Sequence, residues 1–313
     1  MKNIAIIAGG NSSEHEVSMK SGKNIYNEID ETRYNKYLVV LKERDWHVEI
    51  GEEKFPVDKN DFSFTRNGEK ILFDFAYITI HGVPGENGLL QGYLEMMGVP
   101  YGCCNVLASA LTFDKHTCNT YLKSYGVNVA DSVMLIRGMA YDVNEIINEV
   151  GLPCFVKPNA EGSSFGVTKV KKAFALCQEV LIETFIDGTE LTCGVVKAGD
   201  MDIAMPIAEV IPKNEFFDFE AKYDPTKSDE IIPARISPEL TNRIKTLSSM
   251  IYDILRCEGI IRVDYIVRDD EIFMLEVNTT PGMTSNSFVP KMVRAMGGTL
   301  REVLTKIIDN KLN

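Results

Sequence analysis

The amino-acid sequence predicts an α/β protein whose C-terminal half becomes α+β. Short apolar runs of strand length alternate with stretches of helical spacing over about the first 100 residues. Farther along, several strand patterns follow one another between Cys154 and Ile211, which indicates a second sheet region. The length of 313 residues suits two or three domains, at roughly 100–200 residues per domain.

The first expected strand is the apolar run Asn3 to Ala8, which ends at Gly9-Gly10. Because no polar residue interrupts it after Asn3, it predicts a strand buried on both faces, as in a parallel sheet. Asn11-Ser12-Ser13 then precedes a helix that reaches Ile29, and Ser13 and Glu16 have capping-box spacing. The rest of this part is expected in the following order: a strand over 37–41, a polar and turn-rich segment over 51–71, a strand over 75–80 and a helix over 86–97.

The C-terminal part contains patterns of both kinds. One helix is expected over Val106 to Tyr125, with Asp114 and Lys115 inside it, and a strand over Cys154 to Lys157 is stopped by Pro158. The remaining elements are expected in the following order: strands over 167–170, 180–186, 191–196 and 203–211, an amphipathic helix over 238–257, a strand pair over 260–267 and 271–277 joined at Asp269-Asp270, a Gly/Pro/Ser-rich loop over 279–288 and a helix over 299–308.

Composition and charge exclude several classes of protein. A hydrophobic fraction of 45% and a charged fraction of 25% exclude a disordered or disulfide-scaffold chain. The net charge of −12 offers no counterion release on DNA, so we expect no nucleic acid partner. Seven scattered cysteines without a C-x-x-C pair indicate reduced thiols and no structural zinc. Without an apolar run of 18 residues or a signal-peptide pattern, we expect no membrane span and a cytoplasmic protein.

The first candidate site is the Gly/Ser-rich loop over 161–166, which follows Lys157. Its backbone N–H groups can approach phosphate oxygens, and the lysine can neutralise their charge. The loop is expected between two strands and the chain has no G-x-x-x-x-G-K-[ST], so it is neither a Rossmann nor a Walker A phosphate loop. An ordinary hairpin loop stays the alternative.

The second candidate site combines Arg262-Val263-Asp264 with Glu276-Val277-Asn278. Side chains alternate along a strand, so Asp264, Glu276 and Asn278 can converge if the two strands pair as a hairpin. Three oxygen ligands without His or Cys suit Mg²⁺. The alternatives are a surface hairpin with outward-facing acids and, for Arg262, an ion pair with one of them.

The loop from Asn278 to Ser285 is the third candidate site. It contains Pro281, Gly282 and several small hydroxyl residues. Such a loop can aim backbone N–H groups at an oxyanion or a carboxylate. Taken alone it predicts only a turn.

These residues, taken together, resemble a known family. The chain resembles the ATP-grasp ligases in a set of residues and their order along the sequence. This set is Lys157, Glu161-Gly162-Ser163-Ser164, Glu183, Lys222-Tyr223, Arg262-Val263-Asp264 and Glu276-Val277-Asn278-Thr279. Within that superfamily, the segments Gly9 to Ser18, His81 to Gly88 and Pro281 to Ser285 are similar to the D-alanine–D-alanine ligase family. The resemblance covers nearly the whole chain.

The resemblance implies an ATP-grasp fold preceded by a parallel-sheet domain, with ATP between two antiparallel sheets. The implied domains are an N-terminal α/β substrate domain over 1–103, a central ATP-grasp domain over 104–189 and a C-terminal ATP-grasp and metal-binding domain over 190–313. It also implies a reaction in which ATP phosphorylates one D-alanine and the amine of a second D-alanine displaces phosphate from the acyl phosphate. Two Mg²⁺ (or Mn²⁺) ions and a homodimer are implied, and a monovalent cation is left open.

The resemblance further implies residue roles. ATP would be held by Lys115, Lys157, Glu183, Phe185, Ile186, Glu190 and Lys222, with the base at 183–186 and the ribose at Glu190. The metal ligands would be Asp264, Glu276 and Asn278, and the oxyanion would be stabilised by Arg262 and the Gly282 N–H. Glu14 would bind the ammonium of the first D-alanine, with His81 as an open member of that pocket, and Ser287 and Phe288 would bind the carboxylate of the second. Ser163 and Tyr223 would join Glu14 in a hydrogen-bonded link that closes the site.

Each of these roles has a plainer alternative. Glu14 could only favour a helix N-terminus, Ser163 could be a loop hydroxyl, Tyr223 a core ring and Lys115 a solvated lysine.

The sequence departs from the family at Asn87, where Asp is common, at Phe185, where Trp is frequent, and over 42–72, which is short. Tyr223 favours D-alanine as second substrate. The alternatives are a D-Ala–D-Ser or D-Ala–D-lactate ligase, and a non-catalytic nucleotide-binding regulatory protein. We expect the charged segment near 213–230 to form a lid.

Overall fold

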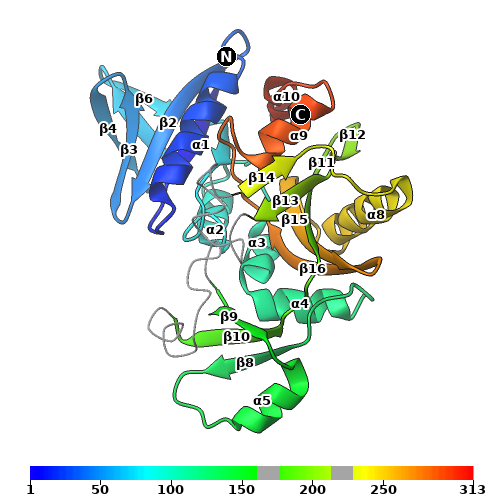
Figure 1. Cartoon of the computed structure of the whole chain (residues 1–313). Helices are drawn as coiled ribbons and strands as arrows, with labels where there is room; N and C mark the ends of the chain where they lie inside the picture. Colours follow the sequence, from blue (N-terminus) through cyan, green and yellow to red (C-terminus); the bar gives the residue numbers. More distant parts are fainter. Residues whose placement is uncertain (161–176, 213–227, 313) are drawn as a thin grey trace.

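The structure is a computed structural model that describes residues 1–160, 177–212 and 228–312. Three sheets organise the described part of the chain (Figure 1). The N-terminal sheet has seven strands in the order β6-β5-β4-β3-β2-β1-β7, the central sheet has the order β8-β10-β9, and the C-terminal sheet has the order β14-β13-β11-β15-β16 with β12 beside β11. The mixed α/β fold class is confirmed.

The N-terminal sheet is parallel only at one end, where β2, β1 and the edge strand β7 lie. β1 (Lys2–Gly9) pairs in parallel with β2 (Tyr34–Lys42) and with β7 (Phe75–Ile78). The other strands, which pair antiparallel, are β3 (Asp45–Ile50), β4 (Glu53–Asp58), β5 (Ser63–Arg66) and β6 (Glu69–Leu72). The prediction of a turn-rich segment over 51–71 is therefore incomplete. Turns with positive φ at Gly51, Asn67 and Gly68 do occur, but buried Val57 and Phe64 alternate between them and form strands.

Helix α1 (His15–Glu28) begins differently from the prediction. Its N-cap residue is Glu14, and no side chain caps it, so the Ser13–Glu16 capping box is wrong. The hydroxyl of Ser12 instead donates to the His81 carbonyl at 2.7 Å and accepts the Glu14 N–H at 3.2 Å. The start of α1 is therefore tied to the residues after β7.

The helix expected over 106–125 is two helices, α3 (Val106–Phe113) and α4 (Lys115–Lys123). Asp114 breaks it, with an extended backbone at φ −89° and ψ 102°, and its carboxylate accepts the Thr117 N–H at 2.8 Å. An aspartate between two helical stretches favours the N-cap of the second, because its side chain competes with helical hydrogen bonds. Lys115 consequently lies in the first turn of α4. Helix α2 (Leu89–Met96) precedes both.

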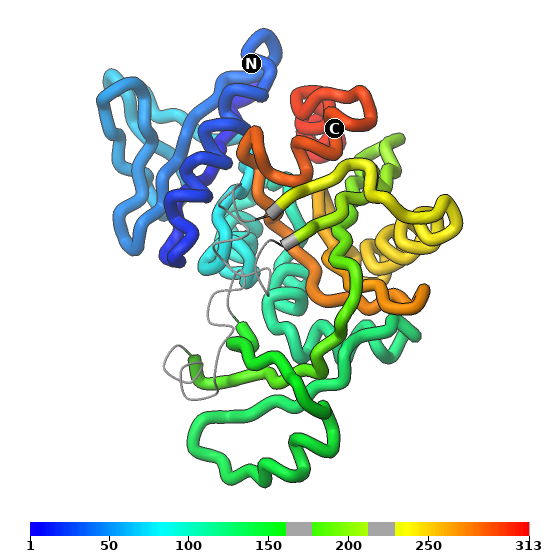
Figure 2. Tube along the Cα trace, viewed as in Figure 1, coloured from blue at the N-terminus to red at the C-terminus, as the bar shows by residue number. Residues whose placement is uncertain are grey.

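The central sheet consists of β8 (Ser132–Ile136), β9 (Cys154–Pro158) and β10 (Glu179–Thr184), all antiparallel, with α5 (Val143–Val150) packed on it. β8 and α5 were not predicted. The expected strand over 167–170 lies outside the described residues. This sheet and α5 form the end of the molecule opposite both termini (Figure 2).

The C-terminal sheet is also antiparallel. Its strands are β11 (Thr189–Ala198), β12 (Met201–Ala204), β13 (Ala208–Pro212), β14 (Ser228–Ile231), β15 (Gly259–Arg268) and β16 (Glu271–Asn278). The single strand expected over 203–211 is two strands, because Met205, Pro206 and Ile207 separate β12 from β13. Helix α8 (Pro238–Ile254) packs on this sheet, and its N-cap Ser237 accepts the Leu240 N–H at 3.1 Å.

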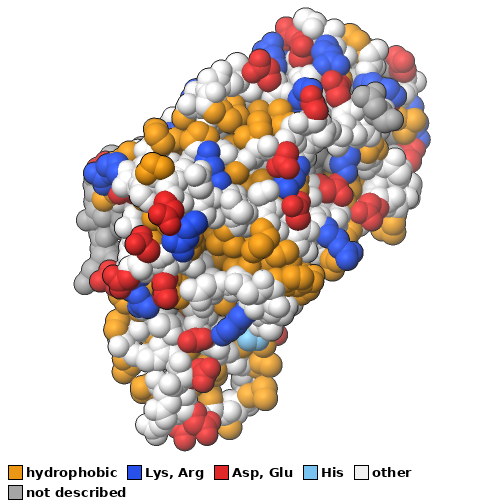
Figure 3. Space-filling model, turned by 90° about the vertical axis from the view of Figure 1, so that its right-hand side faces the viewer, with side chains coloured by type: hydrophobic (Ala, Val, Ile, Leu, Met, Phe, Trp, Pro, Cys, Tyr) orange, Lys and Arg blue, Asp and Glu red, His pale blue; other side chains and the backbone are white. Residues whose placement is uncertain are grey.

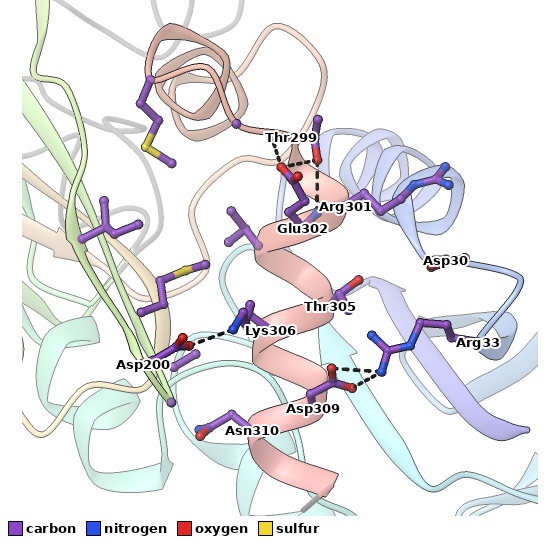
Figure 4. Close-up of a pocket in the computed structure, with 17 residues that line it drawn as sticks. Asp30, Arg33, Asp200, Thr299, Arg301, Glu302, Thr305, Lys306, Asp309 and Asn310 are labelled. Carbon is purple, nitrogen blue, oxygen red and sulfur yellow. Dashed lines mark hydrogen bonds and ion pairs between the residues drawn. The ribbon is translucent and has the colours of Figure 1, made fainter.

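Helices α9 (Phe288–Ala295) and α10 (Leu300–Leu312) follow the last strand and pack with residues of both the N-terminal and the C-terminal sheets. One apolar cluster contains Ile4 and Ile25 of the N-terminal part, Val196 of β11 and Leu304 of α10. Figure 4 shows α10 between the two parts, with charged pairs on both sides. Asp309 accepts hydrogen bonds from Arg33 and from the Tyr34 hydroxyl. On the other side Lys306 reaches Asp200 at 2.8 Å.

A surface cavity of about 1060 Å³ runs along α10. Asp309, Lys306 and Arg33 line it, and they already pair within the protein. The cavity therefore follows the contact of α10 with its neighbours, and none of the candidate active-site residues lines it. On the face shown in Figure 3, acidic and basic side chains are interspersed with hydrophobic areas. In the described part of the chain, no helix combines the length and hydropathy needed to cross a membrane.

We predict that Asp309→Ala lowers the free energy of unfolding by about 1 kcal/mol, since it leaves the hydroxyl of buried Tyr34 without its acceptor. Burial, together with this carboxylate, raises the pKa of Tyr34, so the hydroxyl stays a donor at neutral pH. Urea unfolding of both proteins measures the difference. The control is Asp200→Ala, which breaks only an exposed ion pair on the other side of α10 and should leave stability unchanged. Equal stability of Asp309→Ala and wild type would contradict this role.

Candidate active site

The strand pair β15–β16 brings the predicted acidic residues together. Asp264 lies opposite Glu276, and Arg262 lies opposite Asn278. The turn between the strands has positive φ at both Asp269 (51°) and Asp270 (64°), which suits a tight hairpin. The hairpin that the sequence analysis assumed is therefore present.

The Asp264 carboxylate is the centre of a hydrogen-bonded group. Arg262 donates to both of its oxygens, each at 2.8 Å. The Thr192 hydroxyl on β11 donates to it at 2.6 Å, and the Asn278 amide at 3.1 Å. The ion pair left open for Arg262 thus exists, with Asp264 as the partner. The Arg262 guanidinium also lies 5.6 Å from the ring centroid of Phe288, at the start of α9.

The chemistry of these side chains fits a hard divalent cation. Among the described residues, no three His, Cys, Asp or Glu side chains form a ready-made metal cluster. Asp264 and Glu276 supply two carboxylates, and Asn278, whose amide nitrogen contacts Asp264, can offer its amide oxygen. Mg²⁺ commonly binds few protein groups and completes its octahedral shell with waters and phosphate oxygens. The donor set therefore suits Mg²⁺ next to a nucleotide better than a closed protein cage.

Two lysines occupy the central sheet and its neighbouring helix. Lys157 on β9 forms an ion pair with Glu183 on β10 at 2.5 Å, and Asn119 of α4 donates to the same carboxylate at 3.3 Å. The Lys157 side chain is 16% exposed. Lys115 is 9% exposed, so the alternative of a solvated lysine is wrong. The loop over 161–166, with Ser163, lies outside the described residues.

An apolar surface lies near the end of β10. The rings of Phe155 and Phe185 have centroids 5.3 Å apart, and buried Ile186 packs with Ile266 and Phe273. Glu190 follows on β11, opposite Ile266.

Hydrogen bonds within the protein already occupy part of the backbone of residues 183–186, which were expected to bind the base. The N–H of Thr184 donates to the Asp131 carbonyl at 2.9 Å, and the N–H of Phe185 donates to the Pro153 carbonyl at 3.4 Å. The Glu183 carboxylate is occupied by Lys157. The N–H groups of Thr184 and Phe185 are therefore occupied within the protein.

The loop after β16 is compact around Gly282. A Cβ at this position would lie 2.9 Å from the Ser287 Oγ, so the missing side chain makes room for that hydroxyl. Ser287 Oγ accepts the Thr284 N–H at 3.1 Å and contacts the Thr284 hydroxyl at 2.8 Å. Ser287 therefore does not cap α9, which starts at Phe288 without a side-chain cap. The first N–H groups of α9 and the helix dipole favour an anion there.

Residues of the N-terminal part contact this loop. His81, which is 4% exposed, is held by a 2.9 Å contact between its Nδ1 and the Thr280 carbonyl. Because a carbonyl only accepts, we assign the proton to Nδ1. Asn24 of α1 donates to the Met283 carbonyl at 2.7 Å, and Ser21 accepts the Met283 N–H at 3.1 Å. The structure thus brings His81 to the loop that carries Gly282.

Two acids, buried Glu14 and partly buried Glu86, belong to this region. Glu14 is 3% exposed at the start of α1, where the helix-dipole alternative remains open. The Glu86 carboxylate accepts the Gly82 N–H at 2.7 Å. Burial raises the pKa of Glu86, the Glu14 charge adds to this, and His81 acts in the opposite direction. Glu86 was missed as a site residue, although it stands in the His81 to Gly88 motif. Asn87 accepts the Leu89 N–H at 3.3 Å, so the departure from Asp retains a structural acceptor.

Three predicted site residues cannot be placed. Ser163, Lys222 and Tyr223 lie outside the described residues, as does most of the lid expected near 213–230. Of that segment the structure describes only its last residues, which belong to β14.

Comparison with known proteins identifies the family. Models of the D-ala D-ala ligase N-terminus and C-terminus match residues 3–104 and 121–309. The D-alanine–D-alanine ligase of Bacteroides fragilis is 54% identical over 99% of both chains.

Solved structures agree with this. The VanG D-Ala:D-Ser ligase of Enterococcus faecalis has a TM-score of 0.85 and 31% identity over 99% of both chains. A Bacillus anthracis D-alanine–D-alanine ligase complexed with ATP has a TM-score of 0.78 and 28% identity, covering 100% of this chain and 98% of its own. The paired antiparallel sheets are those of an ATP-grasp ligase, as predicted. The chain belongs to the D-alanine–D-alanine ligase family.

We predict that Glu86→Gln stabilises the protein at neutral pH and less so in acid. A carboxyl whose pKa is raised in the folded state favours folding while protonated and loses that contribution as pH rises through its folded pKa. Glutamine keeps an oxygen for the Gly82 N–H and carries no charge. Unfolding by urea between about pH 4 and pH 7 measures the difference, since an ordinary glutamate titrates near 4.3. A difference between variant and wild type that does not change with pH would contradict the assignment.

Proposed function

We propose that this protein joins two molecules of D-alanine to D-alanyl-D-alanine, with conversion of ATP to ADP and phosphate, for peptidoglycan precursor synthesis. The observation that carries the proposal is the β15–β16 hairpin, where Asp264, Glu276 and Asn278 share one site with Arg262. A cation site and a fixed guanidinium side by side suit the transfer of a phosphoryl group to a carboxylate. Family membership supports the same reaction.

The nucleotide would lie between the central and C-terminal sheets. Lys115 and Lys157 would neutralise its phosphates, which would require Lys157 to share its charge with Glu183. Phe185 and Ile186 would pack against the base, and Glu190 would take the ribose hydroxyls. Lys222 would reach the phosphate that is transferred.

Two Mg²⁺ (or Mn²⁺) ions would be held by Asp264, Glu276 and Asn278 and would neutralise charge on the phosphate oxygens when bound. Each oxygen of the Asp264 carboxylate already accepts two hydrogen bonds, so binding a cation would require Asp264 to give up at least one of them.

The acyl transfer would be carried by the loop after β16. The carboxylate of the first D-alanine takes the phosphoryl group, the amine of the second attacks the acyl carbon, and phosphate leaves the tetrahedral intermediate. Arg262 and the Gly282 N–H would stabilise the oxyanion of that intermediate. Glu14 would pair with the ammonium of the first D-alanine, and His81 would line its pocket.

The second D-alanine would bind at the start of α9. Ser287 and the Phe288 N–H would receive its carboxylate, which suits a helix start without a side-chain cap. Ser163 and Tyr223 would link to Glu14 and close the site. Tyr223 supports D-alanine over D-serine or D-lactate as acceptor, and an amine nucleophile would favour alkaline pH. We further propose a cytoplasmic homodimer.

The direct test is phosphate release from ATP and Mg²⁺, with and without D-alanine. We expect release that depends on D-alanine and a dipeptide as product. Reactions with D-serine or D-lactate as a second acceptor test the alternatives, and a dominant mixed product would overturn the Tyr223 argument. ATP binding without turnover of any D-amino acid would support the regulatory alternative.

We predict that Glu276→Gln abolishes D-alanine-dependent phosphate release while the protein remains folded. The change removes one of two cation-binding charges and almost no volume, so turnover should fall at least about a hundredfold. Circular dichroism checks the fold. A matched control is Glu271→Gln, at the exposed start of the same strand, which should retain full activity. A folded Glu276→Gln protein with near-wild-type turnover would refute the metal assignment.

A further inference from the structure

Asn159 is a buried side chain at the point where β9 meets α4. It follows Lys157 by two residues and is 0% exposed. Its amide nitrogen donates to Asp114 at 2.8 Å and to Glu179 at 3.0 Å, and its amide oxygen accepts the His116 N–H at 2.9 Å. Both hydrogen-bonding atoms of this side chain therefore have partners, and these come from two segments, the start of α4 and the start of β10.

The backbone of Asn159 makes two more contacts. Its carbonyl accepts the Lys115 N–H at 3.2 Å, and its N–H donates to the Glu179 carbonyl at 3.0 Å. One residue thus joins the end of β9, the start of β10 and the first turn of α4.

The first turn of α4 is fully capped as a result. Asn159 takes the N–H groups of Lys115 and His116, and Asp114 takes that of Thr117 at 2.8 Å. These N–H groups are the ones that a helix start normally offers to an anion. Since they are occupied, a phosphate at this place has to be bound by the Lys115 side chain.

Asn159 also links the two lysines geometrically. Lys157 lies on β9 two residues before it, and Lys115 is the first residue of the helix that it caps. The position of one lysine relative to the other therefore depends on a short chain of bonds through Asn159.

We propose that Asn159 is a positioning residue for ATP binding, which fixes the spacing of Lys115 and Lys157 and forces the phosphate contact at α4 onto a side chain. This inference rests on the proposed function. It assigns to Asn159 no contact with substrate.

The test measures KM for ATP and kcat in D-alanine-dependent phosphate release. Asn159→Ala removes three hydrogen bonds and leaves the backbone contact to Lys115, so we expect KM for ATP to rise about tenfold, the size of one lost charged hydrogen bond. The kcat at saturating ATP should change by less. Asn105→Ala is the control, because it removes the N-cap of the neighbouring helix α3 without contacting either lysine, and it should leave KM unchanged.

A double-variant cycle separates positioning from a purely structural role. If Asn159 acts through Lys115, Asn159→Ala should raise KM little further in a Lys115→Ala background, because the positioned group is gone. Additive effects, or an unchanged KM in folded Asn159→Ala, would overturn the inference.

If Asn159→Ala does not fold, Asp114→Ala gives the same test, because Asp114 accepts a hydrogen bond from the Asn159 amide. It removes the acceptor of the Asn159 amide and the cap of Thr117, so it should raise KM for ATP non-additively with Lys115→Ala. Loss of D-alanine-dependent turnover in the wild-type protein would instead count against the proposed function, which keeps the two failures distinct.

Discussion

The site depends on one carboxylate, that of Asp264, which accepts hydrogen bonds from three side chains at once. Arg262 lies on the same strand, Thr192 on β11 and Asn278 on β16. An aspartate that is only 16% exposed costs free energy unless it is paired, and this network supplies the pairing. The same bonds fix the guanidinium of Arg262 against the Phe288 ring. The proposed cation site and the proposed oxyanion site therefore share the hydrogen-bonded pair Arg262–Asp264.

The site is completed by contacts between segments far apart in the sequence. His81 and Asn24 of the N-terminal part bind carbonyls of the loop after β16, and Ser21 accepts an N–H from it. The loop has little secondary structure, so these contacts hold its backbone in place. Residues of the N-terminal part therefore help to set the backbone conformation of a loop that follows a strand of the C-terminal sheet.

Sequence reasoning predicted the elements whose pattern is local. Buried strands such as Asn3 to Ala8 and the hairpin around Asp269-Asp270 follow from apolar runs and turn residues. The segment over 45–72 was missed because its strands are short and partly exposed, so polar residues hid the alternation. The break at Asp114 shows the same limit, because helical spacing continues on both sides and only the cap reveals the end. Asn159 was missed because its side-chain amide nitrogen bonds to Asp114 and Glu179, which lie far from it in the chain. Glu86 was missed because its raised pKa comes mainly from burial, which the local sequence pattern does not reveal.

The shared apolar cluster has a consequence for biosynthesis. Ile4 and Ile25 emerge from the ribosome long before Leu304, although all three belong to one cluster. Helix α10 covers apolar side chains of α1 and of the N-terminal sheet. Until residues 300–312 have been synthesised, these side chains remain exposed to solvent. Domains usually fold as units during translation, and exposed apolar surface at that stage invites association with other chains. Nascent chains of this protein therefore expose this apolar surface until α10 has been synthesised.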